Sequence, residues 1–581
     1  MSHKGYTNEK NVQIVLALLK AHNIRKVVAS PGATNITVVA SMQQDPWFEM
    51  YSSVDERSAA YIACGLAEES GEPVVLSCTG ATASRNYEPG MTEAYYRKLP
   101  ILALTSTQNT NRIGHLIAQN VDRSVLPNDI ATVRVNIPMV RDVNDAWECE
   151  VKANEAMLAL RRNGGGPVHI NLATSYSRDY SVEKLPEVRS IMRYNVHDKL
   201  PELPSGRIAV FVGSHKQWTA EETAALDSFC ATNNAVVFCD HTSGYKGKYR
   251  VLYALVASQL KRANDLRNID LCIHIGEISG DYFTLGLAFK NVWRVNADGE
   301  LRDTFRKITK VFEMPEISFF KHYSREGANE TSLLDAYLAD CEQTRKMMPE
   351  IPFGNLWVAK QLSGNLPQDS VLHLGILNTL RSWNMFEIPA SVRSYCNVGG
   401  FGIDGGVSSL IGASLVDRKK IYIGIVGDLA FFYDMNAIGN RHVGNNCRIL
   451  IINNGRGVEF RNYAHQGSVF GEQTDTYIAA AGHYGNKSPM LVKSMAEALG
   501  YEYMSASDKD EFTKVYERFV TPKLTDKPMI FEVFTNTEDE SSALEIMRNY
   551  MQGVPVAAPS KKEEKEKPGL LKKLIPGLNK K

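Results

Sequence analysis

The sequence predicts an α/β protein built from three doubly wound parallel-sheet domains, followed by a disordered C-terminal tail. Short apolar runs recur along the chain, and segments with helical spacing separate them. The runs are continuously apolar rather than alternating, which is typical of parallel strands covered by helices on both faces. We expect strands at KVVAS, PVVLSC, ILALT, VHINL, IAVFV, AVVFC, DLCIHI, VWRV, SVLHL, YIGIV, RILIIN and MIFEVF.

Length and composition are those of an ordinary globular protein. The chain has 581 residues, with 65 basic and 65 acidic side chains and 44% apolar residues. At about 100–200 residues per domain this length predicts three or four domains, and zero net charge gives no overall attraction to nucleic acid. The apolar stretch near the N-terminus is too short to span a membrane and lacks a cleavage site, which predicts a cytoplasmic protein.

The nine cysteines form no CxxC pair, and most lie in apolar runs such as AVVFC and DLCIHI. Cysteine in such a run behaves as a small hydrophobic residue. This pattern argues against a zinc site and a disulfide framework, and it favours a reducing compartment.

Two segments lack apolar strand runs and contain proline and charge, at residues 180–205 and 343–354. We interpret them as linkers, which divides the chain into domains at 1–185, 200–345 and 352–553. The middle domain has strand-to-loop junctions but no GxGxxG fingerprint, so we predict neither FAD nor NAD there.

Residues 554–581 change in composition. A Lys/Glu run predicts a flexible tether, and apolar residues then recur on one helical face, with lysines available to the other. Those apolar residues are Leu570, Leu571, Leu574, Ile575 and Leu578. We expect this short basic amphipathic segment to dock on a partner protein or a membrane surface, with partner docking preferred. The alternative is a frayed tail without a function.

Polar residues follow two consecutive strands of the third domain. Gly427 and Asp428 end the strand YIGIV, and Asn453 and Asn454 end the strand RILIIN. Open α/β sheets bind ligands at the carboxyl ends of their strands, and Mg²⁺ prefers oxygen ligands of this kind. The helix expected after Asp428 also favours negative charge at its start. The pattern indicates a magnesium–diphosphate site, although Asp428 taken alone is equally well explained as a helix cap.

Glu56 begins the small-residue helix SAAYIACGLA, which has few polar side chains to solvate a carboxylate. One interpretation is a charge satisfied by the free N–H groups of the helix start. The other is an acid whose pKa is raised by apolar surroundings and which exchanges a proton during catalysis.

With GD followed about 25 residues later by NN, and with SPG and DERSAAY in the first domain, the chain resembles the thiamine-diphosphate enzymes from about residue 10 to 550. The resemblance implies a pyrimidine-binding domain, a central Rossmann-like domain and a diphosphate-binding domain, in that order. It also implies thiamine diphosphate and Mg²⁺ as cofactors. It further implies a homodimer or homotetramer with the active site at the subunit interface.

The same resemblance implies roles for individual residues. Asp428, Asn454 and the main-chain carbonyl of Arg456 would hold Mg²⁺, while Glu56 would hydrogen-bond the aminopyrimidine ring. Ile403 would support the cofactor's bent shape, and Gln119 would lie beside the reacting carbon. The implied cofactor-binding residues are Glu56, Gly402, Ile403, Gly427, Asp428, Leu429, Ala430 and Asn454.

Within these enzymes the chain looks most like the menaquinone-pathway succinyl-enolpyruvyl-hydroxycyclohexene-carboxylate synthases, which use oxoglutarate and isochorismate. Most of their substrate-binding basic residues are replaced, and only Arg381 is retained. The replacements are Thr34, Gln108, Asp281, Tyr282 and Val398. Each lost charged contact is worth on the order of 1.5–3 kcal/mol, so we expect a less anionic substrate.

New polar residues stand near the expected entrance to the site. Glu459, Arg461 and His465 follow the metal-binding asparagine, and His115 precedes Gln119 by one turn if that segment is helical. Histidine transfers protons near neutral pH, which makes His115 and His465 catalytic candidates. Each is alternatively an ordinary surface histidine, and Phe460 is either a substrate-facing wall or core packing. We take Thr34, Arg381, Glu459 and Phe460 as candidate substrate-binding residues.

Three functions remain open from the sequence. The preferred one is decarboxylation of a 2-oxo acid followed by transfer of the acyl-anion equivalent to an acceptor, as a carboligase. The second is a simple decarboxylase that releases an aldehyde. The third, a non-catalytic scaffold, is disfavoured because Glu56, Asp428 and Asn454 are all present.

Overall fold

The computed structural model describes residues 5–123, 125–262, 264–483 and 487–556, and the predicted docking segment of the tail lies outside them. The predicted α/β class with three parallel sheets is confirmed. The chain forms two compact units, one from residues up to 206, 269–275 and 289–322, and one from the remainder. Within the described residues, no helix combines the length and apolarity that a membrane span requires.

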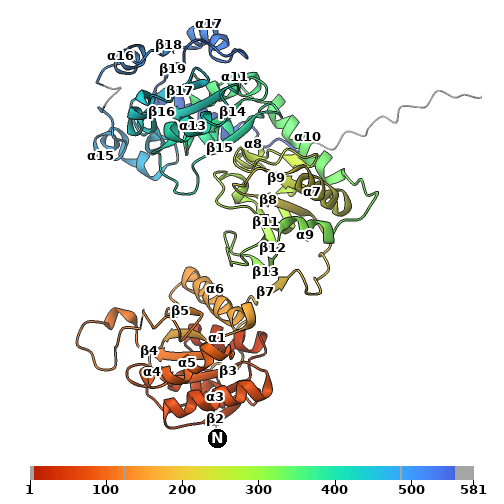
Figure 1. The fold of residues 1–581 in the computed structure, drawn as a ribbon, viewed down its shortest axis with the longest axis vertical. Helices are drawn as coiled ribbons and strands as arrows, with labels where there is room; N and C mark the ends of the chain where they lie inside the picture. The colour runs from red at the N-terminus through yellow and green to blue at the C-terminus, as the bar shows by residue number, and fades with distance from the viewer. Residues whose placement is uncertain (1–4, 124, 263, 484–486, 557–581) are drawn as a thin grey trace, which may run out of the picture. The chain divides into compact units, whose positions relative to one another are not determined.

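The first sheet has the strand order β2-β1-β3-β4-β6-β5. Its strands are β1 (Lys26–Ala29), β2 (Glu49–Ser52), β3 (Val74–Thr79), β4 (Ile101–Thr107), β5 (Val133–Ile137) and β6 (Val168–Ala173). The helices of this unit are α1 (Lys10–Ala21), α2 (Ile36–Gln43), α3 (Glu56–Ser70), α4 (Ala83–Asn86), α5 (Glu88–Arg97), α6 (Val143–Ala159) and α9 (Glu316–His322). Figure 1 shows them in red to orange, with α9 in green.

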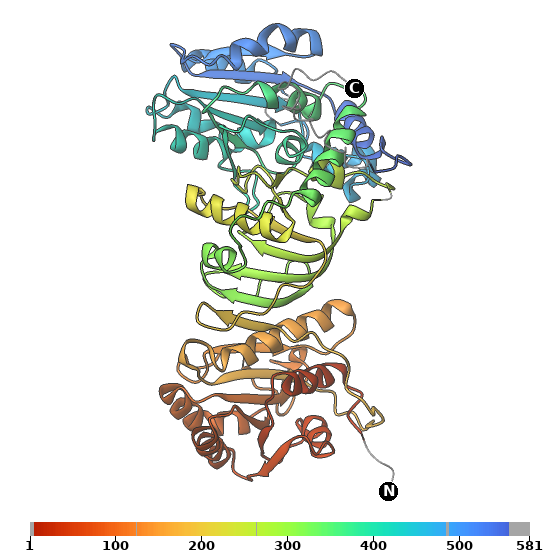
Figure 2. The ribbon, with the colours of Figure 1, turned by 90° about the vertical axis from the view of Figure 1, so that its right-hand side faces the viewer.

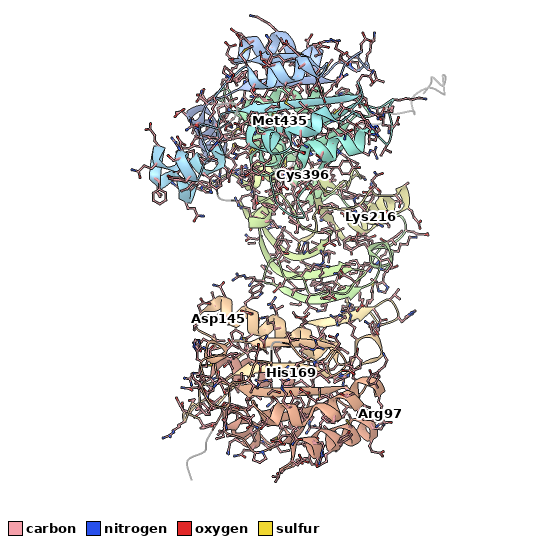
Figure 3. All side chains as sticks on the ribbon, turned by 60° about the vertical axis from the view of Figure 1, so that its left-hand side comes forward. Arg97, Asp145, His169, Lys216, Cys396 and Met435 are labelled. Carbon is pink, nitrogen blue, oxygen red and sulfur yellow. The ribbon has the colours of Figure 1, made fainter. Side chains whose placement is uncertain are left out.

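Both faces of this sheet are buried, as continuous apolar strands require. One core packs α1 and α6 against the sheet, and a second packs α3 and α5 against the opposite face. Figure 2 shows helices on both sides of the strands. His169 of β6, labelled in Figure 3, is 2% exposed inside these layers.

The middle sheet has the order β10-β9-β8-β11-β12-β13-β7. Its strands are β7 (Met192–Asn195), β8 (Ile208–Val212), β9 (Ala235–Phe238), β10 (Arg250–Val251), β11 (Asn268–Ile275), β12 (Ala288–Asn296) and β13 (Ile308–Glu313). Strand β7 pairs in parallel with β13. The segment 180–205, which we interpret as a linker because it lacks an apolar run, thus contains β7, a short and partly exposed edge strand.

The third sheet has the order β15-β14-β16-β17-β19-β18. Its strands are β14 (Val371–Leu374), β15 (Arg393–Cys396), β16 (Tyr422–Gly427), β17 (Cys447–Asn453), β18 (Glu502–Ala506) and β19 (Met529–Phe534). The helices of this unit are α7 (Ala220–Asn233), α8 (Ala254–Ala257), α10 (Ser332–Lys346), α11 (Asn355–Leu362), α12 (Asn378–Trp383), α13 (Gly406–Ser414), α14 (Asp428–Tyr433), α15 (Thr474–Tyr477), α16 (Leu491–Ala498), α17 (Lys509–Phe519) and α18 (Thr537–Asn549). Counted along the chain, its strands follow the same spatial order as those of the first sheet, 2-1-3-4-6-5.

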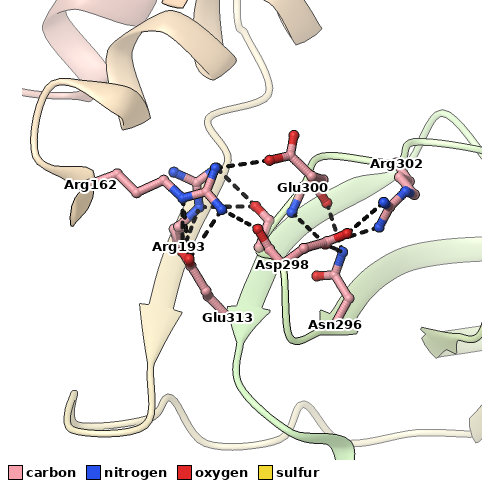
Figure 4. Close-up of polar contacts among 8 residues, drawn as sticks. Arg162, Arg193, Asn296, Asp298, Glu300, Arg302 and Glu313 are labelled. Atoms are coloured by element: carbon pink, nitrogen blue, oxygen red, sulfur yellow. Dashed lines mark hydrogen bonds and ion pairs between the residues drawn. The ribbon is translucent and has the colours of Figure 1, made fainter. Parts of the chain in front are cut away.

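Ion pairs connect the end of α6 to β13 in the first unit (Figure 4). Arg162 follows α6 and hydrogen-bonds both carboxylate oxygens of Glu313, at 3.1 and 3.2 Å, and also pairs with Glu300. Arg302 pairs with Asp298 in the neighbouring turn. These ion pairs hold residues 295–303 (VNADGELRD) in place, which gives this segment a structural role.

The cysteines lie in the protein interior, as their place in apolar runs predicts. Eight of the nine are buried, and Cys396 is partly exposed. Their burial raises the pKa of thiols such as Cys78 and Cys447 to about 12, which leaves them protonated and unreactive.

Candidate active site

The predicted magnesium site lies at the carboxyl edge of the third sheet. Strand β16 ends at Gly427, directly beside Ile452 of β17, so Asp428 and Asn454 each follow the end of an adjacent strand. Gly427 is the residue before α14, and Asp428 is its first residue. The parallel register therefore brings the predicted carboxylate and carboxamide to the same point.

Asp428 is 3% exposed, and its carboxylate accepts hydrogen bonds from the backbone N–H groups of Leu429 and Gly455. Burial raises its pKa to about 7. Gly455 has φ +76°, a conformation that favours glycine and turns the chain between Asn454 and Arg456. A buried carboxylate without a cationic partner is costly, so its placement fits a bound cation.

The other two predicted ligands lie in the turn that contacts Asp428. Asn454 donates to Glu540, and its Oδ1 accepts the N–H of Arg456 at 3.4 Å. The Arg456 carbonyl accepts the N–H of Val458 at 2.9 Å. A carboxylate, a carboxamide and a carbonyl are the oxygen donors that Mg²⁺ prefers, so these three residues fit the ion. Asn453 points into the protein instead, donating to Glu532 at 2.7 Å.

Glu540, in the first turn of α18, was missed by sequence reasoning. It is 7% exposed, accepts the N–H of Asn355 at 3.1 Å and the Thr535 hydroxyl at 2.8 Å, and contacts Asn454. Burial raises its pKa to about 7. In the sequence it stands within TEDE, which is indistinguishable from an ordinary acidic helix start.

The loop after β14 passes close to β16. A Cβ at Gly375 would lie 3.2 Å from the carbonyl oxygen of Ile425, which is tighter than an ordinary contact, so a side chain there would crowd β16. Leu377 then adopts φ +63° immediately before α12. Leu429 and Ala430, the predicted diphosphate contacts, are half-buried in the first turn of α14.

Gly402 and Ile403 lie between β15 and α13. Gly402 is exposed and Ile403 is half-buried. Phe401 before them has φ +58°, and its ring meets that of Tyr282 edge-on at 5.8 Å. The segment leaves both predicted cofactor contacts accessible.

Arg381 and Glu459, two predicted substrate-binding residues, contact each other. Arg381 Nη1 lies 2.9 Å from Glu459 Oε2, and Nη2 lies 3.0 Å from Oε1. Arg381 belongs to α12, and Glu459 belongs to the 3₁₀ turn η7 (Val458–Arg461). The ring of Tyr282 lies 5.4 Å from the guanidinium.

The remaining residues of that loop have local partners. His465 Nδ1 accepts the N–H of Gly467 at 3.0 Å, which caps the next turn and leaves Nε2 available. Phe460 packs edge-on against His465, with ring centroids 5.5 Å apart. Arg461 forms an ion pair with Asp475 at 2.6 Å.

In the first unit, Glu56 is the first residue of α3 and Asp55 is its N-cap. The Glu56 carboxylate is half-buried and accepts a hydrogen bond from Asn86 at 2.9 Å. Asp55 satisfies the N–H groups of Arg57 and Ser58, so the helix start does not depend on Glu56 for capping.

His115 and Gln119 are exposed in a loop of turns. The helical spacing considered for them is not present, because Leu116 and Gln119 both have positive φ, at +57° and +63°. Neither side chain is brought to Glu56 by a contact among the described residues.

Several positions that replace basic residues are used internally. The Thr34 hydroxyl is buried and donates to the carbonyl of Ser106 at 2.6 Å, so it is occupied by packing rather than open to a ligand. Asp281 is 3% exposed and accepts the N–H groups of Phe283 and Thr284. Val398 is buried, and Gln108 donates to the hydroxyl of Tyr176 at 2.8 Å.

Comparison with known proteins agrees with this geometry. The family "Thiamine pyrophosphate enzyme, N-terminal TPP binding domain" matches residues 10–126, and the corresponding "C-terminal TPP binding domain" matches residues 379–533. The two matches contain Glu56 and the Asp428–Asn454 site respectively.

Full-length relatives carry the name 2-succinyl-5-enolpyruvyl-6-hydroxy-3-cyclohexene-1-carboxylate synthase. The one from Bacteroides thetaiotaomicron is 30% identical, covering 93% of this chain and 98% of its own. Those from Phocaeicola vulgatus and Flavobacterium psychrophilum are 30% and 27% identical, over 94% and 90% of this chain. The chain therefore belongs to the thiamine pyrophosphate enzymes and is similar, along nearly its whole length, to these synthases.

Proposed function

We propose that the protein uses thiamine diphosphate and Mg²⁺ to decarboxylate a 2-oxo acid and transfers the acyl-anion equivalent to an acceptor. The observation that carries this proposal is Asp428, buried against the turn of Asn454 and Arg456 at the carboxyl edge of the third sheet. When bound, thiamine diphosphate supplies a carbon nucleophile and stabilises the charge left by departing CO₂.

We assign the residue roles that the family resemblance implies to the positions described above. Asp428, Asn454 and the Arg456 carbonyl hold the cation, and the first turn of α14 orients negative charge beside it. Gly402 and Ile403 position the cofactor ring. Glu56 would hydrogen-bond the aminopyrimidine and could hold a proton there, and its position at a helix start, without a capping duty, supports that role. Gln119, His115 and His465 are the candidates for positioning the donor and moving protons.

We infer that the working enzyme is a homodimer or homotetramer in which Glu56 of one subunit meets the Asp428 site of another. Large apolar side chains are exposed near Glu56, including Val54 at 78% and Tyr61 at 48%. Others are exposed in the second unit, including Tyr433 at 68% and Tyr477 at 91%. Covering such side chains in a subunit interface would remove their apolar surface from water.

The substrate is less anionic than that of a synthase with a full basic clamp. Thr34 and Val398 are buried, and the Asp281 carboxylate caps its own turn, so none of these positions offers a positive charge. The retained Arg381 is paired with Glu459.

A product assay by mass spectrometry tests the proposed function. The protein is incubated with thiamine diphosphate, Mg²⁺ and either pyruvate or oxoglutarate, with and without an aldehyde or ketone acceptor. A new ligated product supports carboligation, aldehyde alone supports the decarboxylase, and no CO₂ release from either acid contradicts the proposal.

A further inference from the structure

The pair between Arg381 and Glu459 has the geometry of a bound carboxylate ligand. Both terminal nitrogens of Arg381 face both oxygens of Glu459, at 2.9 and 3.0 Å, and the two side chains are only 15% and 17% exposed. This two-point arrangement is how arginine recognises a planar carboxylate in proteins. Here the carboxylate belongs to the chain itself.

The pair spans the edge of the sheet at which ligands bind. Arg381 lies in α12, which follows β14, and Glu459 lies in η7, which follows β17. Strand β16, which ends at Asp428, stands between β14 and β17 in the sheet. The ion pair therefore joins the two loops that flank the predicted cation site.

Neighbouring groups hold Glu459 in this position. The Asn378 amide, oriented so that its oxygen and nitrogen both find partners, donates to Glu459 Oε2 at 2.6 Å and accepts the Glu459 N–H at 3.2 Å. Tyr282 covers the guanidinium from another side. A free carboxylate must displace an anchored one that is already well bonded, which lowers its apparent affinity.

We infer that Glu459 is a specificity-determining residue: it occupies the carboxylate-binding face of Arg381 and so excludes substrates that carry a second carboxylate. The inference rests on the proposed function and adds the substrate class, a 2-oxo acid whose remaining part is uncharged. Neutralising Glu459 frees the guanidinium and creates a site for a dicarboxylate.

Glu459→Gln in the full chain, loaded with thiamine diphosphate and Mg²⁺, tests this inference with succinate as an inert probe. Calorimetry is expected to give at least a tenfold tighter Kd for succinate than the unmodified protein gives. In the same variant, the ratio of kcat/KM for oxoglutarate to kcat/KM for pyruvate rises at least tenfold. The matched control is Glu502→Gln, which breaks a similar two-point pair, at 2.7 and 2.8 Å, between Glu502 of β18 and Arg518 of α17.

Unchanged succinate affinity in Glu459→Gln overturns the inference, as does a gain that persists when Arg381→Ala is added. If the Gln variant does not fold, Glu459→Asp is used instead. Its side chain is shorter by one methylene, so succinate affinity should rise by a smaller factor than in Glu459→Gln. Failure of the proposed function would give a different result. The unmodified protein would release no CO₂ from any 2-oxo acid, whereas the succinate titration would still measure the effect of Glu459 on carboxylate binding.

Discussion

The carboxylate of Asp428 accepts a hydrogen bond from the main-chain N–H of Gly455, which joins the end of β16 to the turn after β17. The contact depends on the parallel pairing of the two strands, because Gly427 lies beside Ile452. Residues 27 positions apart are thereby held as one group of oxygen donors. Loss of this carboxylate would remove a proposed Mg²⁺ ligand and one contact to the turn that carries the other two, although the Gly455 N–H also meets Asn453 Oδ1 at 3.2 Å.

We predict that Asp428→Ala loses Mg²⁺ and thiamine diphosphate affinity together, by at least 100-fold, because the ion links the protein to the diphosphate. Calorimetric titration of the cofactor in the presence of Mg²⁺ measures the effect. Asp510→Ala, an exposed residue in the first turn of α17, is the control. Normal cofactor affinity in the Asp428 variant would rule out the metal assignment.

Glu56→Gln is expected to retain measurable cofactor binding and to lower kcat by at least 100-fold. The amide keeps the size of the side chain but cannot accept and return a proton. Cofactor titration and steady-state rates separate the two effects. Glu69→Gln, exposed in the same helix, should match the unmodified enzyme in both. A Glu56 variant with normal kcat would make the residue structural.

Acid should destabilise the fold through buried histidines. His241 is 2% exposed, its Nε2 meets the carbonyls of Trp383 and Phe386 at 2.9 and 3.0 Å, and burial lowers its pKa to about 4. An unfolded histidine titrates near 6.5, so the unfolded chain binds the extra proton between these values. The contribution of neutral His241 to the free energy of unfolding is therefore complete above pH 6.5. It falls by about 3 kcal/mol as the pH is lowered to 4.

Urea unfolding at several pH values measures this dependence. His241→Gln should flatten it, whereas His197→Gln, which changes an exposed histidine, should leave it unchanged. An equal slope in the His241 variant would assign the acid sensitivity to other groups, such as His169 of the first unit, whose pKa burial lowers to about 3.

The buried pair of Arg262 and Asp340 is a stability determinant of the second unit. The two side chains are 1% and 0% exposed with a 2.7 Å contact, and Asp340 also accepts from Tyr253 and Asn264. Asp340→Asn leaves a buried guanidinium without its counter-charge and is expected to cost about 3 kcal/mol of unfolding free energy. Denaturant unfolding measures it. Glu342→Gln, which breaks an exposed pair with Lys346, should cost less than about 0.5 kcal/mol.

The protein should not replace a synthase that uses oxoglutarate and isochorismate. We expect its kcat/KM for that pair to be at least 100-fold below that of the Bacteroides thetaiotaomicron relative under the same conditions. The reason is that Thr34, Asp281 and Val398 supply no positive charge. Comparable turnover by the two proteins would refute the charge argument.

The sequence predicted the interior of each sheet better than its borders. Every predicted strand is present, and six of the seven strands without a quoted apolar run are edges: β2 and β5, β7 and β10, β15 and β18. An edge strand pairs on one side only and is less buried, as in β7 and β18, so its residues do not form a continuous apolar run. The seventh, β13, mixes polar residues into its run.

The candidate site shows a similar division. Asp428 and Asn454 were predictable because strand ends of a parallel sheet meet at one edge. The contact of Arg381 with Glu459 was not, because it joins residues 78 positions apart whose separate roles gave no sign of pairing. Glu540 was missed for another reason: it is buried beside the start of α11 and the turn after β17, and nothing in TEDE indicates these contacts.

The repeated strand order of the first and third sheets has a consequence for how the enzyme can change. The residue proposed to activate the cofactor, Glu56, stands on one repeat, while Asp428 and the Arg381–Glu459 pair stand on the other. Substitutions at the Arg381–Glu459 pair can therefore change how the site treats substrate charge without touching α3, which carries the proposed activating acid. Such separation lets new substrates be acquired by drift in one set of loops while the shared chemistry is inherited intact.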